Sequence, residues 1–202
     1  MVIILNKIIL ASKSIDRSEM LKRAGIPFEV FVTNIEEEKF KTKISNAVEL
    51  VKELAKAKLI YAKNELKKKK IDVIIIAADT IVLINGEIIG KAHTEEQAFN
   101  ILKKLVGKSH KLITAIAITD IQSSNFILDS DTTIVEFIEL SDEEIWHYIK
   151  TDEWKGRAGA YSIMDKASLF ISKINGSTSN VIGLPLHKIY QILRREFGLN
   201  LL

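Results

Sequence analysis

Three places in the sequence combine side chains of types that bind phosphate or metal ions. At the first, an apolar run through Leu10 gives way to Ser12-Lys13-Ser14, and a helical pattern begins at Ile15. A helix N-terminus has unpaired N–H groups and a partial positive charge, so this junction could hold a phosphate. The segment lacks the glycines of a P-loop, and a plain N-cap role for Ser14 is the equal alternative.

The second place is Asp79, which follows the apolar run 72–78. Such a run is typical of a strand that is covered on both faces, and open α/β sheets bind ligands at the carboxyl ends of their strands. The Asp79 carboxylate is therefore expected at a ligand-binding position and is a candidate functional residue.

A predicted hairpin follows Asp79. Asn85-Gly86 between two β-type runs indicates a two-residue turn, which places Ile84 opposite Glu87. Counting back, Thr80 faces Lys91, so the ammonium should return beside Asp79. A carboxylate and an ammonium together suit a phosphorylated substrate with a metal ion, and an ordinary surface ion pair is the alternative.

The third place is the run Glu36-Glu37-Glu38, in a polar stretch ahead of a long helical pattern. Carboxylates bind Mg²⁺ or orient a water, although a charged run in a loop is more often simply solvated. The four histidines are scattered and have no metal-ligand spacing. Cysteine is absent, which excludes a disulfide framework and a thiolate zinc site.

The elements that must position these side chains follow from hydrophobic periodicity and caps. Capping patterns begin at Asn46, Thr94 and Ser141. Strands alternate with helices around an antiparallel middle section, which predicts an α/β or α+β fold with a mixed sheet. The expected strands are 3–10, 28–32, 72–78, 80–84, 87–91, 111–119, 125–128, 132–140 and 169–174, and the expected helices are 15–24, 46 to about 67, 94–107, 141–149 and one beginning near 185.

Composition excludes several classes of protein. The chain has 202 residues, 47% hydrophobic and 27% charged, which argues against disorder and favours a single domain. No apolar run approaches a membrane span, and Asn6 and Lys7 interrupt the apolar N-terminus, which is therefore expected to be a strand and not a signal peptide. Twenty-nine basic against 26 acidic residues form no stripe for nucleic acid. We expect a cytoplasmic protein without nucleic-acid or membrane partners.

Taken together, these segments resemble the Maf family of nucleoside triphosphate pyrophosphatases. The resemblance spans nearly the whole chain in the right order, and its motifs are specific as a set. The matching segments are Leu10 to Arg17 (family L-A-S-x-S-P-R-R), Ala78-Asp79-Thr80 and Gly90-Lys91-Ala92 (A-D-T and G-K-P), Val106 to Thr114 (S-G-x-x-H-x-V-x-T), Arg157 to Asp165 (K-A-G-A-Y-G-I-Q-G) and Ile174 to Pro185 (I-x-G-x-x-x-x-V-x-G-L-P).

The resemblance implies a two-lobed α/β fold of the Maf/ITPase type, with a mixed twisted sheet flanked by helices and a cleft between lobes. It implies cleavage of nucleoside triphosphates between the α and β phosphates with Mg²⁺ or Mn²⁺, and it suggests a homodimer. By motif position, Asp79 matches the general base. Glu37 (or Glu36), Lys58 and Lys91 match the other catalytic groups, with Asp79 and Glu37 as metal ligands. Ser12, Ser14, Arg17 and Arg157 match the substrate-binding groups.

Three positions bear on base selection. The family branch that acts on dTTP and UTP typically has Arg, Thr and Gln there, and the 7-methyl-GTP branch has Trp, Gln and Glu. This sequence has Asp16, Thr80 and Met164, so only Thr80 agrees with the first branch and none with the second. The expected substrates are dTTP, UTP or modified nucleotides in a house-cleaning role. The alternative is a nucleotide-binding regulator of cell division with little or no hydrolysis.

Overall fold

The structure is a computed structural model that describes residues 7–68 and 71–202; the predicted opening of the first strand and the end of the lysine run 67–70 lie outside these residues. The elements in chain order are β1 (Lys7–Ala11), α1 (Ile15–Arg23), β2 (Phe28–Val30), α2 (Glu38–Lys41), α3 (Ala47–Lys67), β3 (Val73–Ile84), β4 (Glu87–Ile89), α4 (Glu95–Leu105), β5 (Ser109–Asp120), β6 (Ile127–Phe137), α5 (Asp142–Ile149), the 3-10 helix η1 (Lys166–Leu169), β7 (Ile171–Asn175), α6 (Thr178–Ile182) and α7 (Leu186–Phe197).

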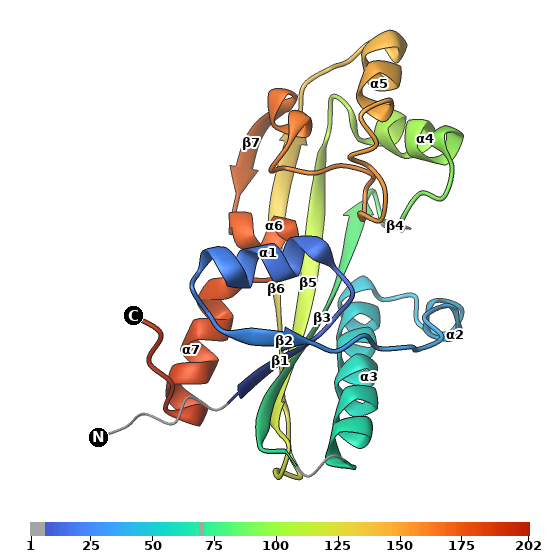
Figure 1. Cartoon of the computed structure of the whole chain (residues 1–202). Helices are drawn as coiled ribbons and strands as arrows, with labels where there is room; N and C mark the ends of the chain where they lie inside the picture. Colours follow the sequence, from blue (N-terminus) through green and yellow to red (C-terminus); the bar gives the residue numbers. More distant parts are fainter. Residues whose placement is uncertain (1–6, 69–70) are drawn as a thin grey trace. The chain divides into compact units, whose positions relative to one another are not determined.

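The seven described strands form one mixed sheet, which confirms the predicted α/β class (Figure 1). The order along the sheet is β2-β1-β3-β5-β6-β7, and β4 pairs with β3. β1 runs parallel to both β2 and β3, whereas the β3–β4 and β6–β7 pairs are antiparallel. The parallel part accounts for the continuous apolar run of β3, because helices cover such strands on both faces.

The chain divides into two compact units. Unit 1 consists of Met1–Asp79, Thr114–Ser130 and Gly183–Leu202, and unit 2 consists of Thr80–Ile113 and Asp131–Ile182. The chain passes from one unit to the other within β3, β5 and β6, and again after α6.

Two predicted pairs of short strands are single long strands. β3 continues through Asp79 to Ile84, so Asp79 lies inside a strand and not at its carboxyl end. β6 likewise runs unbroken from Ile127 to Phe137 across the polar residues 129–131. The expected breaks were wrong because neighbouring strands hold these residues extended, and a polar side chain interrupts the hydrophobic pattern without interrupting the backbone ladder.

The structure confirms the helix caps that the sequence predicted at Ser14, Asn46 and Ser141. The Ser14 hydroxyl accepts a hydrogen bond from the Arg17 N–H at the start of α1, and the Asn46 side chain caps α3 in the same way. Ser141 and Glu144 form a reciprocal capping box on α5. In α3 the apolar positions 50, 51, 54 and 55 are buried, as helical spacing requires.

The hairpin turn is confirmed, and its second strand is two residues shorter than the expected range 87–91. Ile84 pairs with Glu87 as expected, and Asn85 and Gly86 both have positive φ. β4 ends at Ile89, however, and the bridge made by Lys91 is to Ala158 in unit 2. Lys91 therefore lies beyond the end of the β3–β4 ladder, and its expected place beside Asp79 and Thr80 stays a prediction.

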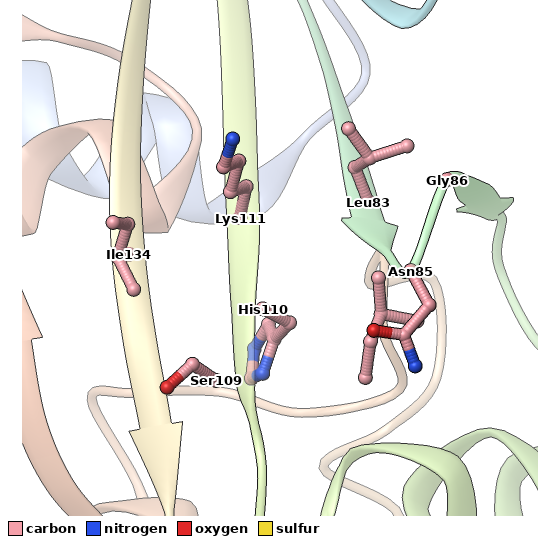
Figure 2. Close-up of a pocket in the computed structure, with 8 residues that line it drawn as sticks. Leu83, Asn85, Gly86, Ser109, His110, Lys111 and Ile134 are labelled. Carbon is pink, nitrogen blue, oxygen red and sulfur yellow. The ribbon is translucent and has the colours of Figure 1, made fainter.

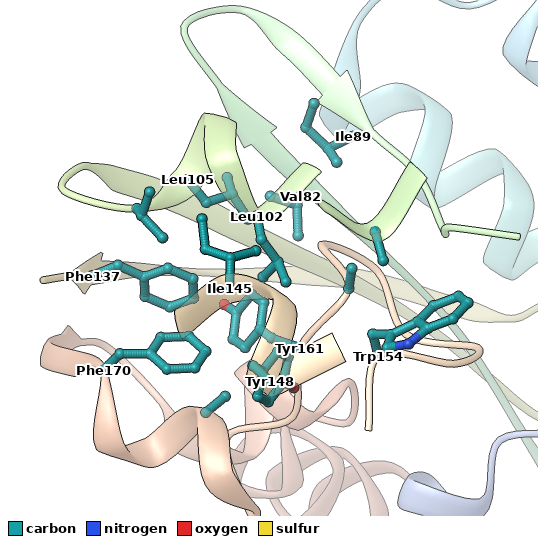
Figure 3. Close-up of a cluster of buried hydrophobic side chains, with 14 of the residues drawn as sticks. Val82, Ile89, Leu102, Leu105, Phe137, Ile145, Tyr148, Trp154, Tyr161 and Phe170 are labelled. Atoms are coloured by element: carbon teal, nitrogen blue, oxygen red, sulfur yellow. The ribbon is translucent and has the colours of Figure 1, made fainter. Parts of the chain in front are cut away.

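Unit 2 has its own aromatic core (Figure 3). Phe137 makes edge contacts with Tyr161 and Phe170, and Tyr148 makes one with Phe170. His110 joins this cluster, since its Nε2 lies 2.9 Å from the Tyr161 hydroxyl and its ring contacts Phe137. Edge-to-face packing of this kind fixes β5 and β6 against the segment that follows α5.

Candidate active site

Arg17 lies in the first turn of α1, where the cap at Ser14 sets the direction of the helix. Its side chain is buried and turns back toward the strands. Nε donates to the Gly183 carbonyl at 2.7 Å, and Nη1 donates to the Ala78 carbonyl at 2.9 Å and to the Ser12 hydroxyl at 3.2 Å. The guanidinium therefore links α1 to the residue before Asp79 and to the segment that leads into α7.

The Ser12 hydroxyl is oriented by two donors. Besides the Arg17 guanidinium, the Ser14 backbone N–H donates to the same oxygen at 3.1 Å. A serine hydroxyl has two acceptor positions and one proton, so both acceptor positions are occupied and the proton is available to an anion. This arrangement supports Ser12 as a substrate-binding residue. Ser14 acts as the N-cap of α1 in the structure, and its predicted phosphate contact stays a prediction.

Asp79, Lys58 and Glu37 meet at one point in unit 1. Lys58, on the buried face of α3, forms a short ion pair with the Asp79 carboxylate and a second ion pair, of 2.8 Å, with Glu37. The side chains of Lys58 and Asp79 are each 11% exposed, and that of Glu37 is 36% exposed. Glu36 instead pairs with Lys39 on the surface, so of the two candidates Glu37 is the one that contacts Lys58.

The charges around this point support one another. Burial lowers the pKa of Arg17, and the nearby carboxylates of Asp79, Glu37 and Asp16 oppose that effect. Burying a charged group without a partner is costly, so these cations and carboxylates depend on each other. The result is a nearly buried polar centre at the middle of β3.

The two carboxylates fit a divalent metal with help from a ligand. In the ranges 7–68 and 71–202, no group of three or more His, Cys, Asp or Glu side chains is placed to hold a metal ion. Asp79 and Glu37 nevertheless converge on a single cation, the Lys58 ammonium. Mg²⁺ prefers oxygen ligands and is commonly held by one or two carboxylates together with substrate phosphates. The donor set therefore suits a metal that a nucleotide also binds.

The remaining predicted residues belong to unit 2. Arg157 forms an ion pair of 3.7 Å with Asp165, whose carboxylate also accepts a hydrogen bond from Ser162. Met164 is exposed in the same segment. Thr80 is half-buried in β3, and Lys91 is exposed next to its bridge partner Ala158. The part that these residues play in catalysis or base selection stays a prediction.

A separate pocket of about 340 Å³ in unit 2 contains none of the predicted site residues. Leu83 and Asn85 of the hairpin line it together with Ser109, His110 and Lys111 at the start of β5 (Figure 2). This pocket contains no carboxylate, and we do not assign it to the reaction.

Sequence reasoning missed the role of backbone carbonyls. Gly183 and Ala78 contribute only their C=O groups to the Arg17 contacts. The motif Gly183-Leu184-Pro185 is visible in the sequence, but nothing in it indicates which side chain its carbonyl binds. Gly183 has a φ of 112°, a conformation that favours glycine, so the presence of a glycine at this position was the signal that the sequence offered.

The fold and site define a mixed α/β protein in which a nearly buried aspartate in the middle of β3 and a partly exposed glutamate both pair with one lysine of α3. A family model described as Maf-like protein matches residues 7–196, and the chain belongs to this family. It is 47% identical to a dTTP/UTP pyrophosphatase from Alkaliphilus oremlandii (strain OhILAs), over 98% of this chain and all of the relative. It is 41% identical to a dTTP/UTP pyrophosphatase from Caldanaerobacter subterraneus subsp. tengcongensis, over 95% of this chain and 90% of the relative.

One similar solved structure is a nucleoside-triphosphatase (dITP/XTP pyrophosphatase) from Mycobacterium abscessus. The match covers 65% of this chain and 72% of that chain, with 13% identity and a TM-score of 0.34. In the part of the chain that the structure describes, none of the helices combines the length and apolarity needed to cross a membrane.

Proposed function

We propose that this protein is a nucleoside triphosphate pyrophosphatase that cleaves dTTP and UTP between the α and β phosphates. The observation that carries the proposal is the convergence of Asp79 and Glu37 on Lys58 in a nearly buried centre. Relatives of 39–47% identity over almost the full chain are named dTTP/UTP pyrophosphatases, which supports both the reaction and the substrates.

The reaction adds a water oxygen to one phosphorus and breaks the bridging P–O bond, which releases a nucleoside monophosphate and pyrophosphate. Asp79 takes the proton of the attacking water, because it is a carboxylate held in a water-poor site. The Ser12 hydroxyl donates to a phosphate oxygen, since its two acceptor positions are occupied by the protein. Phosphoryl-type transfer depends chiefly on positioning and charge neutralisation, which groups of these kinds supply.

We assign Mg²⁺ or Mn²⁺ as the cofactor, held by Asp79 and Glu37 together with the nucleotide. When bound, the metal would neutralise the charge that develops on phosphate oxygens. Lys58, which pairs with both carboxylates, keeps them together before the metal and nucleotide arrive. Lys91 and Arg157 are proposed to contact the triphosphate on the strength of their motif positions alone.

Pyrophosphate release measured over a panel of nucleotides tests the proposal. The panel holds dTTP, UTP, the other common triphosphates, modified pyrimidines and methylated purines, each with Mg²⁺ or Mn²⁺. We expect the highest kcat/KM with dTTP and UTP. Asp16 and Met164 depart from the pattern typical of that branch, so a preference for a modified base would leave the reaction standing and change the substrate. Binding of nucleotides without pyrophosphate release would indicate a regulator and contradict the proposal.

Replacing the proposed base provides the sharpest test of mechanism. Asp79→Asn keeps the size of the side chain and removes the carboxylate, so we expect kcat for UTP to fall by at least ~100-fold. The matched control is Asp72→Asn, because Asp72 is an exposed acid directly before the same strand. A correctly folded Asp79→Asn protein that retained most of its activity would remove Asp79 from this role.

A further inference from the structure

We infer that Arg17 is a positioning residue that holds the peptide preceding Asp79 in place, with the Gly183 carbonyl as its second anchor, and that it is not a bidentate phosphate ligand. The inference rests on the proposed function, since it concerns the same site. It changes the role that the motif position of Arg17 suggests.

The count of N–H groups is the first argument. A guanidinium has five N–H groups, and a bidentate grip on phosphate needs two parallel N–H groups along one edge. Each such edge includes an N–H of Nε or of Nη1. Here the Nε proton goes to Gly183, and the two Nη1 protons go to Ala78 and Ser12. A bidentate phosphate contact would therefore cost at least one of these hydrogen bonds.

The second argument is where the acceptors lie. The Ala78 carbonyl belongs to the peptide unit whose nitrogen is that of Asp79, so the 2.9 Å contact from Nη1 fixes the backbone next to the proposed base. The ion pair of the Asp79 carboxylate is with Lys58, whereas Arg17 feels this carboxylate through its charge. Arg17 therefore acts on Asp79 through the backbone and through charge, not by gripping its carboxylate. A displacement of the order of 1 Å at a reacting group can cost about 100-fold in rate.

The third argument is the second anchor. Nε makes the shortest of the three contacts, 2.7 Å, with the carbonyl of Gly183, which lies 166 residues away in sequence and in the same unit. Gly183 has a φ of 112°, a conformation that is strained for other residues, so this anchor depends on a glycine. The guanidinium is thus fixed between two backbone segments, and both belong to regular elements or to their immediate ends.

Binding and turnover separate the two roles. We expect Arg17→Lys to lower kcat by about 30-fold or more, because one ammonium cannot reproduce three contacts in the plane of a guanidinium. The Kd for α,β-methylene-dUTP, measured by calorimetry with Mg²⁺, should change by less than about threefold, because a positioning residue contributes little to ground-state binding. Arg23→Lys, an exposed change in the last turn of α1, is the matched control.

Gly183→Ala tests the second anchor. It should lower kcat without weakening binding of the analogue, whereas Gly198→Ala should leave both values unchanged. Gly198 also has positive φ, 66°, and a Cβ there would meet no atom within 4 Å, so this control isolates backbone strain from the Arg17 contact. Circular dichroism confirms that each variant is folded before its kinetics are measured.

Hydrogen exchange followed by mass spectrometry decides the inference independently of activity. In Arg17→Lys, peptides that cover 74–80 should exchange faster than in the wild type. Loss of analogue binding in proportion to kcat, or unchanged exchange in this segment, would overturn the positioning role. A wild-type protein that binds the analogue but releases no pyrophosphate from any nucleotide would instead overturn the proposed function, and the exchange result would still decide the role of Arg17.

Discussion

Lys58 is the cation that pairs with both carboxylates of the polar centre in unit 1. Two carboxylates approach its ammonium, and the aliphatic part of its side chain lies among the buried residues of α3. A buried ion pair is costly to form, but removing one member leaves the other charged and without its partner, which costs more. The same lysine therefore affects both stability and the geometry of the proposed metal ligands.

We expect Lys58→Met to lower the free energy of unfolding by about 3 kcal/mol in metal-free buffer, because Asp79 then stays buried without its ammonium. The double variant Lys58→Met/Asp79→Asn should lose less than the sum of the single changes, since the nearly buried charge at position 79 is then removed together with its partner. Urea unfolding of the four proteins gives the coupling directly.

Lys56→Met is the control for that series. Lys56 is on the same helix and pairs with Glu53 at 3.1 Å, but both side chains are more than a third exposed, and such a pair contributes less than about 1 kcal/mol. Equal losses in Lys56→Met and Lys58→Met would contradict the charge argument.

These residues could be predicted from the sequence more easily than the groups that they contact. Asp79 was a candidate from its residue type and its place after an apolar run, Lys58 only from the family resemblance, and Glu37 was one of two. The choice between Glu36 and Glu37 depends on which carboxylate reaches α3, and residue type cannot show this. The contacts of Arg17 with two carbonyl groups were inaccessible for the same reason, because every residue has a carbonyl.

At the scale of elements, the loop between β7 and α6 depends on one glycine. Gly176 has φ of 131°, and a Cβ built there would lie 2.7 Å from the Thr133 hydroxyl and 3.0 Å from the Thr133 Cα. Thr133 accepts hydrogen bonds from the Ser177 N–H and the Asn180 amide, so it cannot move without breaking them. This contact joins β6 to the start of α6.

Gly176→Ala should therefore destabilise the protein by about 3 kcal/mol, from backbone strain and overpacking together. Gly90→Ala is the comparison, because a Cβ at Gly90 would meet no atom within 4 Å and its φ is not positive. Thermal unfolding of the two variants measures the difference. Similar Tm values for both would show that the Gly176 loop adapts.

Elements set by local signals were predictable, and those set by distant partners were not. The caps at Asn46 and Ser141 and the turn at Asn85-Gly86 depend on residues within four positions of each other. The continuity of β3 and β6 depends on neighbouring strands from elsewhere in the chain, which no local window contains. α2 and α6 are only four and five residues long, too short for helical periodicity to reveal them.

For the whole molecule, acid stability should depend on His110. Burial lowers the pKa of His110 to about 4 from an ordinary value of 6.5. Between these two values the unfolded chain binds a proton that the folded protein excludes. This histidine therefore leaves the free energy of unfolding unaffected above pH 6.5 and lowers it as the pH drops toward 4. At pH 5 this one histidine should cost about 2 kcal/mol of the free energy of unfolding.

Urea unfolding at pH 7.5 and pH 5.0 measures that loss. His110→Gln, which keeps a polar group near the Tyr161 hydroxyl, should be less stable at pH 7.5 and should lose about 2 kcal/mol less on acidification than the wild type. His147→Gln, at an exposed position on α5, is the control and should lose as much unfolding free energy between pH 7.5 and pH 5.0 as the wild type does. An unchanged pH dependence in His110→Gln would show that other groups determine acid lability.

The organisation of the chain also explains why a domain boundary was invisible in the sequence. Unit 1 is assembled from three segments and unit 2 from two, and the chain changes unit in the middle of three strands. Boundaries are ordinarily marked by polar or glycine-rich linkers, but here one of them falls between Asp79 and Thr80 inside a hydrophobic strand.

The orientation of the Ser12 hydroxyl makes it a donor, and not an acceptor, toward a ligand that reaches it. Because the protein already occupies both of its acceptor positions, a ligand atom can pair with it only by offering a lone pair. Ionised oxygens form the strongest hydrogen bonds of this kind, so under the proposed function the contact would favour a charged phosphate over a neutral group. Such a preference requires no base recognition, so it would act alike on every nucleotide with the same phosphate chain.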